Sequence, residues 1–205
     1  MPHKIWPPNG HLAQWVLDQF PAGYRGHAVD VGASDGVSVN TTFHLEKVHR
    51  WTVISVEPNP EFHPMLKRER AWVESCALSR QSSESAVFHV HNENPEAYSA
   101  LRVTERTDMH PQGDATWRDL VVTVRTVDEL LHKWQFPKLD LLAVDTEGTE
   151  VDVLGGCDLR AWKPKTIIVE SWDAGGHDAY LAQTGYARVG RNVHNDLYLR
   201  SVTNV

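Results

Sequence analysis

The sequence predicts an α/β fold built around a mostly parallel sheet with an antiparallel hairpin near its C-terminal end. Short apolar runs alternate with helical patterns through most of the chain, which is the pattern of βαβ units. The central apolar runs are continuous rather than alternating, as expected for strands that helices cover on both faces. The last quarter differs, because two short strand patterns around Gly190 and Asn195 predict a hairpin at one edge of the sheet.

Four apolar runs are expected to form the central strands. They are residues 28–31, 52–56, 139–144 and 166–169. Further strands are expected at residues 85–91 and 120–125, and the two strands of the hairpin at residues 186–189 and 194–199. Between residues 91 and 118 the chain is polar and longer than an ordinary connection, so this stretch is expected to be a lid or an acceptor-binding loop.

Helices are expected between these strands, where apolar residues recur with helical spacing. One such stripe ends at Pro21, and another directly follows the first strand. The two stripes are Leu12, Trp15, Val16 and Phe20, and Val37, Thr41, Leu45 and Val48. Because proline is unfavourable in a helix interior, the helix around Pro64 is expected to begin near His63. A short helix is also expected at residues 178–183.

Two further helices carry a sequence signal at their N-termini. Thr126 and Glu129 have the spacing of a capping box, in which each side chain accepts a hydrogen bond from the other residue's backbone N–H. Thr149 and Asp152 repeat this spacing more weakly, ahead of a glycine pair that ends the helix. The sequence therefore predicts helices that begin just after Thr126 and just after Thr149.

Composition and charge limit the class of protein. A chain of 205 residues is expected to form one domain, with residues 1–26 as an N-terminal helical extension. No apolar run approaches the roughly 18–20 residues that span a bilayer, and the N-terminus lacks a signal-peptide pattern, so a cytoplasmic protein without a membrane partner is expected. Cys76 and Cys157 lie far apart, which argues against a disulfide framework or a cysteine zinc site. The net charge of −7 disfavours nucleic acid as a partner.

A glycine turn at residues 29–36 is the strongest chemical signal in the sequence. Gly32 and Gly36 can adopt positive φ, which lets a ligand approach the backbone beside the N–H groups of the following helix. Their spacing is G-x-x-x-G rather than the dinucleotide pattern G-x-G-x-x-G, and Asp30 and Asp35 place negative charge where a pyrophosphate would lie. This disfavours a nicotinamide-dependent oxidoreductase. A phosphate-free adenosine compound with a positive centre fits better, and S-adenosylmethionine is such a compound.

Acidic residues follow three of the expected strands. Glu57, which follows the second strand, can accept hydrogen bonds from both hydroxyls of a ribose. Asp145 and Glu147 follow the strand at 139–144, at the edge where catalytic groups of such sheets gather. This pair could orient the cofactor's amino group, act as a base, or hold a hard cation such as Mg²⁺ together with Glu170. Glu147 could instead only stabilise the N-terminus of the following helix.

Several of these segments resemble the FkbM-type S-adenosylmethionine-dependent methyltransferases. The resemblance covers roughly residues 27–171 and is most specific at Glu57-Pro58-Asn59-Pro60 and at residues 145–154. Its other segments are residues 29–36, 41–47, 74–79 and 126–131. The resemblance implies a Rossmann-like, seven-stranded methyltransferase fold and transfer of a methyl group to a hydroxyl oxygen, often on a sugar or a natural product. The sequence departs from the usual family pattern at Ser34, Pro64 and Thr149.

The resemblance also implies how the cofactor would be held. Asp30 and the two glycines would line its methionine half, and Glu57 would bind the ribose. Cys76 and Ala77 would lie beside the adenine. The full set of residues expected to contact S-adenosylmethionine is Asp30, Gly32, Ala33, Ser34, Gly36, Glu57, Pro58, Cys76, Ala77 and Asp145.

The expected catalytic residues are Asp145 and Glu147. An alcohol is a poor nucleophile until its proton is removed, so the acceptor needs a base or a metal ion that acidifies its hydroxyl. Asp145 is the first candidate for either role, with Glu147 and Glu170 as partners, and His177 and His194 are alternative bases. The residues expected to shape the acceptor pocket are Tyr98, Arg102, Trp117, Trp172, Asp173 and the loop at 175–177. A protein that binds the cofactor or a nucleoside without chemistry is the alternative, which the carboxylate pair disfavours.

Overall fold

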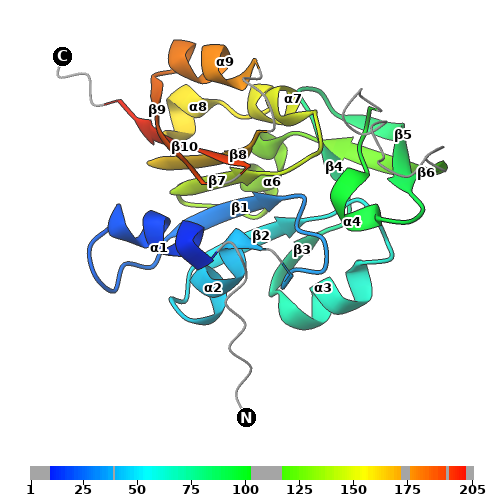
Figure 1. The fold of residues 1–205 in the computed structure, drawn as a ribbon, viewed down its shortest axis with the longest axis horizontal. Helices are drawn as coiled ribbons and strands as arrows, with labels where there is room; N and C mark the ends of the chain where they lie inside the picture. Colours follow the sequence, from blue (N-terminus) through cyan, green and yellow to red (C-terminus); the bar gives the residue numbers. More distant parts are fainter. Residues whose placement is uncertain (1–9, 39, 103–116, 172–175, 193, 202–205) are drawn as a thin grey trace.

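The computed structural model describes residues 10–38, 40–102, 117–171, 176–192 and 194–201 and is built around a seven-stranded mixed sheet (Figure 1). Its strands are β1 (His27–Val31), β2 (Thr52–Val56), β3 (Trp72–Glu74), β7 (Leu141–Val144), β8 (Thr166–Glu170), β9 (Tyr186–Asn192) and β10 (Asn195–Arg200). Their order is β3-β2-β1-β7-β8-β10-β9. Strands β3, β2, β1, β7 and β8 are parallel to one another, and β10 is antiparallel to both β8 and β9. The predicted α/β fold with a C-terminal antiparallel hairpin is confirmed.

A second sheet has three strands in the order β4-β6-β5. These strands are β4 (Ala77–Leu78), β5 (Ser83–His91) and β6 (Trp117–Arg125). The strands expected at 85–91 and 120–125 therefore pair with each other in this separate sheet. The sequence did not predict β3 and β4, because runs of three and two residues are too short to show a periodic pattern.

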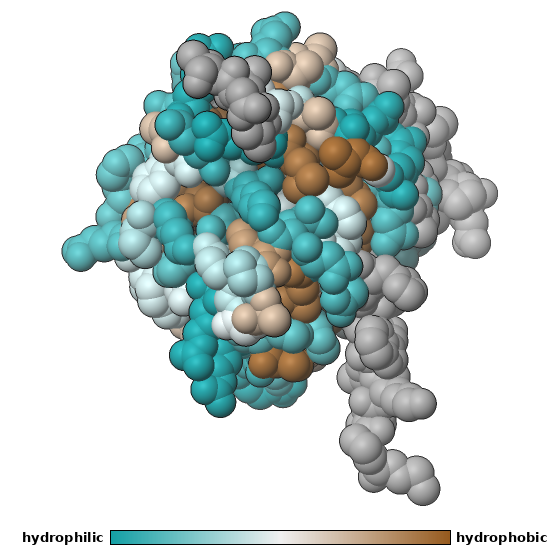
Figure 2. Space-filling view, turned by 90° about the vertical axis from the view of Figure 1, so that its left-hand side faces the viewer, coloured by the Kyte–Doolittle hydropathy of each residue, from teal (hydrophilic) through white to brown (hydrophobic). Residues whose placement is uncertain are grey.

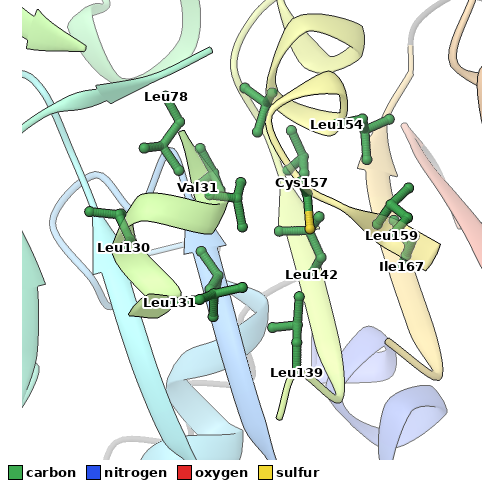
Figure 3. Packing of buried hydrophobic residues seen from close by; sticks show 14 of the residues in the cluster. Val31, Leu78, Leu130, Leu131, Leu139, Leu142, Leu154, Cys157, Leu159 and Ile167 are labelled. Atoms are coloured by element: carbon green, nitrogen blue, oxygen red, sulfur yellow. The ribbon is translucent and has the colours of Figure 1, made fainter. Parts of the chain in front are cut away.

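Helices cover both faces of the seven-stranded sheet. On one face, α1 (Gly10–Asp18) and α2 (Thr41–Lys47) pack against residues such as Ala28. On the other face, α6 (Val127–Lys133), α7 (Glu150–Gly155), α8 (Leu159–Trp162) and α9 (His177–Gln183) pack against residues such as Leu142 (Figure 3). The remaining described helices are α3 (His63–Glu69) and α4 (Pro95–Tyr98). Because neighbouring strand residues point to opposite faces, covering both faces explains the continuous apolar runs of the central strands.

Two of the expected helix starts are confirmed. At α6, the Thr126 hydroxyl accepts a hydrogen bond from the Glu129 backbone N–H at 3.1 Å, and the Glu129 carboxylate accepts one from the Thr126 N–H at 3.0 Å. Such a cap contributes about 1 kcal/mol to stability. Helix α3 begins at His63 and places Pro64 in its first turn, where the missing N–H costs nothing.

Helix α2 starts later than predicted, and α7 lacks the predicted cap. Helix α2 begins at Thr41 rather than near Val37, because the Asn40 side chain caps it by accepting hydrogen bonds from the backbone N–H groups of residues 42 and 43. The Val37 N–H instead donates to the Asp35 carboxylate at 2.8 Å, which forms a local turn that competes with the helix. Helix α7 begins after Thr149 as expected, but the Thr149 side chain makes no capping bond to the helix.

The surface and the ends of the described chain add two observations. Within the described residues, no helix has the length and apolar character needed to cross a membrane. On the face shown in Figure 2, hydrophobic residues lie in several groups separated by hydrophilic ones. Residues 1–9 of the expected N-terminal extension and residues 103–116 of the expected acceptor loop lie outside the described residues.

Candidate functional site

A cavity of about 420 Å³ lies where the parallel strands end. Residues at or just after the ends of β1, β2, β7 and β8 line it, together with residues of β4, β5 and α4. Its volume falls within the roughly 300–1,000 Å³ of small-molecule sites in proteins. Most residues expected to contact the cofactor line this cavity, namely Gly32, Ala33, Ser34, Glu57, Pro58, Cys76, Ala77 and Asp145.

The glycine turn is tied to the ends of both neighbouring strands. The backbone N–H groups of Gly32 and Ala33 each donate to the Val56 carbonyl oxygen of β2 at 3.0 Å. Gly32 has φ +82°, and a Cβ there would overlap the carbonyl oxygen of Asp145, which follows β7. Only glycine therefore allows the ends of β1 and β7 to approach this closely.

Asp30 and Gly36 do not line the main cavity. The Asp30 carboxylate is buried and accepts hydrogen bonds from the side chains of Asn40 at 2.8 Å and Thr42 at 2.7 Å. It borders a small recess of about 30 Å³ that Gly32 also lines. Gly36 has φ +80° and packs against α3, so it shapes the turn. Asp30 thus borders the small recess, and Gly36 lines neither the recess nor the cavity.

Glu57 is a buried carboxylate at the wall of the cavity. Its side chain is 6% exposed and accepts hydrogen bonds from the backbone N–H groups of Ser34 at 2.9 Å and Asn59 at 2.8 Å. Burial raises the pKa of Glu57 to about 7, and the nearby Asp30 and Asp145 carboxylates act in the same direction. A carboxylate has more acceptor positions than these two bonds occupy. It can therefore still accept hydrogen bonds from a pair of ligand hydroxyls.

Apolar side chains line the cavity near Cys76 and Ala77. Burial raises the pKa of the Cys76 thiol to about 12, so this thiol remains neutral at physiological pH. Phe62, before α3, and Phe88, on β5, line the same cavity and were not predicted as site residues. The alternation of the 85–91 strand indicates that Phe88 faces inwards, but this pattern cannot show that the buried side borders a cavity. Such a lining suits a flat heteroaromatic ring.

The turn after β7 presents two acidic residues to the cavity. Asp145 is anchored by its backbone N–H, which donates to the Val31 carbonyl oxygen at 3.0 Å. Glu147 has φ +58°, lines the cavity and is 8% exposed. The Glu150 carboxylate stabilises this turn by accepting a hydrogen bond from the Gly148 N–H at 2.8 Å. Glu150 thus fixes the backbone of the turn between β7 and α7.

Glu170, at the end of β8, completes a group of three carboxylates. One oxygen of each of Asp145, Glu147 and Glu170 lies within 4.8 Å of the others, and all three residues line the cavity. The group concentrates negative charge next to the glycine turn. Oxygen atoms at this spacing could hold a hard divalent cation, and the same charge favours a cationic ligand.

The two histidines proposed as alternative bases lie in different environments. His194 lines the cavity, as Glu170 does. His177 is 3% exposed, and its Nε2 lies 3.1 Å from the carboxylate of Asp196 in β10. The structure therefore places His194, but not His177, at the site.

The residues expected to contact the acceptor are only partly brought together. Tyr98, at the end of α4, lines the cavity. Arg102 points elsewhere and donates a hydrogen bond to Asp152 at 3.2 Å. Trp117 packs its ring against His91 at a centroid distance of 5.0 Å, and neither residue lines the cavity. Trp172, Asp173 and residue 175 lie outside the described residues.

The described residues fit S-adenosylmethionine. A glycine turn packed against the backbone of Asp145, a buried carboxylate that can accept further hydrogen bonds and a group of carboxylates suited to a cation surround one cavity. Together with the seven-stranded sheet and its C-terminal hairpin, these features define the class of S-adenosylmethionine-dependent methyltransferases. The chain belongs to the FkbM methyltransferase domain family, whose model matches residues 30–187.

Comparison with a solved FkbM structure shows the same fold. The methyltransferase FkbM from Methylobacillus flagellatus KT aligns with a TM-score of 0.53 and 15% identity, over 85% of this chain and 43% of that one. This chain thus spans less than half the length of that protein. Precorrin-6y C5,15-methyltransferase from Geobacter metallireducens GS-15 aligns with a TM-score of 0.45 and 11% identity, over 92% of this chain and 85% of that one. A comparison with curated proteins found no match.

Proposed function

We propose that this protein is an O-methyltransferase that transfers the methyl group of S-adenosylmethionine to a hydroxyl oxygen of a small acceptor, such as a sugar or a natural product. The observation that carries the proposal is the group of Asp145, Glu147 and Glu170, whose carboxylate oxygens lie within 4.8 Å of one another. This group borders the same cavity as the glycine turn and Glu57, so a proton acceptor lies next to the expected cofactor site.

The cofactor would be held by residues from three strand ends. Glu57 would accept hydrogen bonds from the ribose hydroxyls, while Ala77 and Phe88 would contact the adenine. Gly32 would allow the methionine half to lie against the backbone. When bound, S-adenosylmethionine supplies a methyl group already activated on a sulfonium, so the protein contributes mainly alignment and proton transfer.

Asp145 is the residue that we assign as the proton acceptor. Removal of the proton from the acceptor hydroxyl makes its oxygen nucleophilic, and the new oxygen–carbon bond forms as the sulfur–carbon bond breaks. Asp145 would take the hydroxyl proton, while the negative charge of Glu147 and Glu170 would favour binding of the positively charged sulfonium beside it. The product is a methyl ether and a neutral thioether.

A divalent cation on the same carboxylates would acidify the acceptor hydroxyl by a different route. Chelation distinguishes the two routes, because direct proton transfer to Asp145 survives EDTA, whereas a cation-dependent reaction stops and is restored by added Mg²⁺. Loss of turnover in EDTA would overturn the assignment of Asp145 as a direct base and leave methyl transfer itself intact.

The proposal is tested by methyl transfer from labelled S-adenosylmethionine to a panel of sugars, polyols and phenols. Asp145→Asn and Glu147→Gln should still bind S-adenosylhomocysteine but lose turnover by about 10²-fold or more, as expected when a positioned base is removed. Asp119→Asn is the control, because Asp119 is 64% exposed on the second sheet and should leave turnover unchanged. Wild-type turnover in both site variants would overturn the assignment, and cofactor binding without transfer to any acceptor would favour a binding module.

A further inference from the structure

Arg70 is a buried cation that the proposed chemistry does not use. It follows α3, and its side chain is 0% exposed. Its guanidinium donates hydrogen bonds to the Gly36 carbonyl oxygen at 3.1 Å, the Asn40 side chain at 3.1 Å and the Thr42 hydroxyl at 2.6 Å. Its Nε donates to the carboxylate of Glu46. The groups that accept these hydrogen bonds thus all lie between residues 36 and 46, from the last glycine of the turn into α2.

The same network reaches Asp30, at the strand end that enters the turn. Asn40 and Thr42, which both accept from Arg70, donate in turn to the Asp30 carboxylate at 2.8 and 2.7 Å. The Arg70 guanidinium also lies 3.6 Å from this carboxylate. Arg70 is therefore linked to Asp30 directly and through two side chains. Asp30 borders the recess beside Gly32, so the network ends at the edge of the expected cofactor site.

The charges in this network require an arginine. Asp30 and Glu46 are both largely buried, and Arg70 is the cation that lies within ion-pair distance of both. A buried charge is tolerated only when it is paired and its hydrogen bonds are satisfied. The planar guanidinium reaches several acceptors at once, whereas the ammonium of a lysine is a single point and cannot span them.

We propose that Arg70 is a positioning residue for the cofactor. It fixes the glycine turn and the Asp30 carboxylate in the arrangement that receives the amino-acid half of S-adenosylmethionine. The inference rests on the proposed function, because it assumes that this half lies against the turn. The adenosine half is expected to meet Glu57, Ala77 and Phe88, and none of these is among the hydrogen-bond and ion-pair partners that the described residues offer Arg70.

This division between the two halves gives the experiment its specific readout. S-adenosylhomocysteine carries both halves, whereas 5′-methylthioadenosine keeps the adenosine and lacks the amino acid. In Arg70→Met, the dissociation constant of S-adenosylhomocysteine should rise about tenfold or more, while that of 5′-methylthioadenosine should change less than about twofold. Arg70→Lys should recover only part of the lost affinity. Isothermal titration calorimetry measures all of these constants.

A matched control and a milder variant keep the test decisive. Arg68→Met makes the same substitution at a 68% exposed position of α3 and should alter neither constant. If Arg70→Met does not fold, Thr42→Val carries the test, because it removes one of the two side-chain links between Arg70 and Asp30 and nearly keeps the side-chain shape. It should weaken binding of S-adenosylhomocysteine about threefold and spare 5′-methylthioadenosine.

The outcomes separate this inference from the proposed function. A wild-type protein that binds neither compound would reject the proposed function, and the role of Arg70 with it. A wild-type protein that binds both, with Arg70→Met or Thr42→Val weakening both equally or neither, would overturn the positioning role alone. Selective loss of affinity for S-adenosylhomocysteine supports it.

Discussion

The α-carbon of Gly32 faces the carbonyl oxygen of Asp145 so closely that a methyl group on the glycine would overlap that oxygen. The two residues follow β1 and β7, which are neighbours in the sheet. The glycine turn and the acidic turn therefore form one continuous surface. Any side chain at position 32 would push the expected cofactor site away from the expected catalytic carboxylates.

Gly32→Ala is accordingly expected to impair both folding and binding. The substitution combines a strained positive φ with an overlap against backbone, which together should lower the free energy of unfolding by about 2–5 kcal/mol. Gly23→Ala is the matched control, because Gly23 also has positive φ but a Cβ there would meet nothing within 4 Å. It should cost only about 1 kcal/mol and leave the affinity for S-adenosylhomocysteine unchanged. Chemical denaturation and calorimetry measure the two effects, and equal destabilisation by both substitutions would refute the overlap.

The raised pKa of Glu57 predicts that cofactor binding depends on pH. Ribose hydroxyls donate hydrogen bonds to the ionised carboxylate, so binding must remove the proton that Glu57 holds below its pKa of about 7. The affinity for S-adenosylhomocysteine should therefore increase as the pH rises from 5.5 to 7 and level off above 8. Calorimetry in buffers with different ionisation enthalpies should show proton release near pH 6.5. A pH-independent affinity in the wild type would contradict this role.

The same shift has the opposite effect on the free protein. Between the ordinary pKa of 4.5 and the folded value of about 7, the folded state holds a proton on Glu57 that the unfolded state has lost. The free energy of unfolding should therefore fall as the pH rises through this window, by about 1–3 kcal/mol in total. Glu57→Gln should flatten this dependence, which denaturation curves from pH 4.5 to 8 would show.

Asp196 is expected to stabilise the C-terminal hairpin. Although burial opposes ionisation, hydrogen bonds from Arg191 and His177 lower the pKa of Asp196 to about 2. The resulting stability is present above the ordinary value of 3.8 and is lost as the pH falls towards 2. Asp196→Asn should lower the free energy of unfolding at pH 7 by about 2 kcal/mol. The exposed Asp119→Asn should change it by less than about 0.5 kcal/mol, and a similar effect from both would refute the assignment.

Residues that follow the central strands could be placed from the sequence, because the carboxyl ends of parallel strands share one edge of the sheet. Glu57 and Asp145 were found in this way, and both line the cavity. The pattern could not show that Asp30, one residue before the end of β1, points to the α2 side and is held by Asn40 and Thr42. That arrangement depends on Arg70, which lies forty residues further along the chain in a stretch without any motif.

The second sheet shows the same limit. Strand β4 has only two residues, and its pairing with β6 joins segments more than forty residues apart, so local periodicity gave no sign of it. Phe88 reaches the cavity only because this sheet lies next to the ends of the main strands. Contacts that depend on the packing of two sheets are thus the part of the site that the sequence did not predict.

The two cysteines allow occupancy of the cavity to be measured within a single molecule. Burial raises the pKa of both thiols, so each should react slowly with iodoacetamide at pH 8 and quickly in denaturant. Both cysteines belong to the same hydrophobic core cluster, but Cys76 also lines the cavity and Cys157 does not. Because any ligand that stabilises the fold slows labelling of both thiols by suppressing global unfolding, Cys157 reports that general effect. Saturating S-adenosylhomocysteine should protect Cys76 beyond the protection of Cys157, as measured by mass spectrometry, and equal protection would place the ligand away from Cys76.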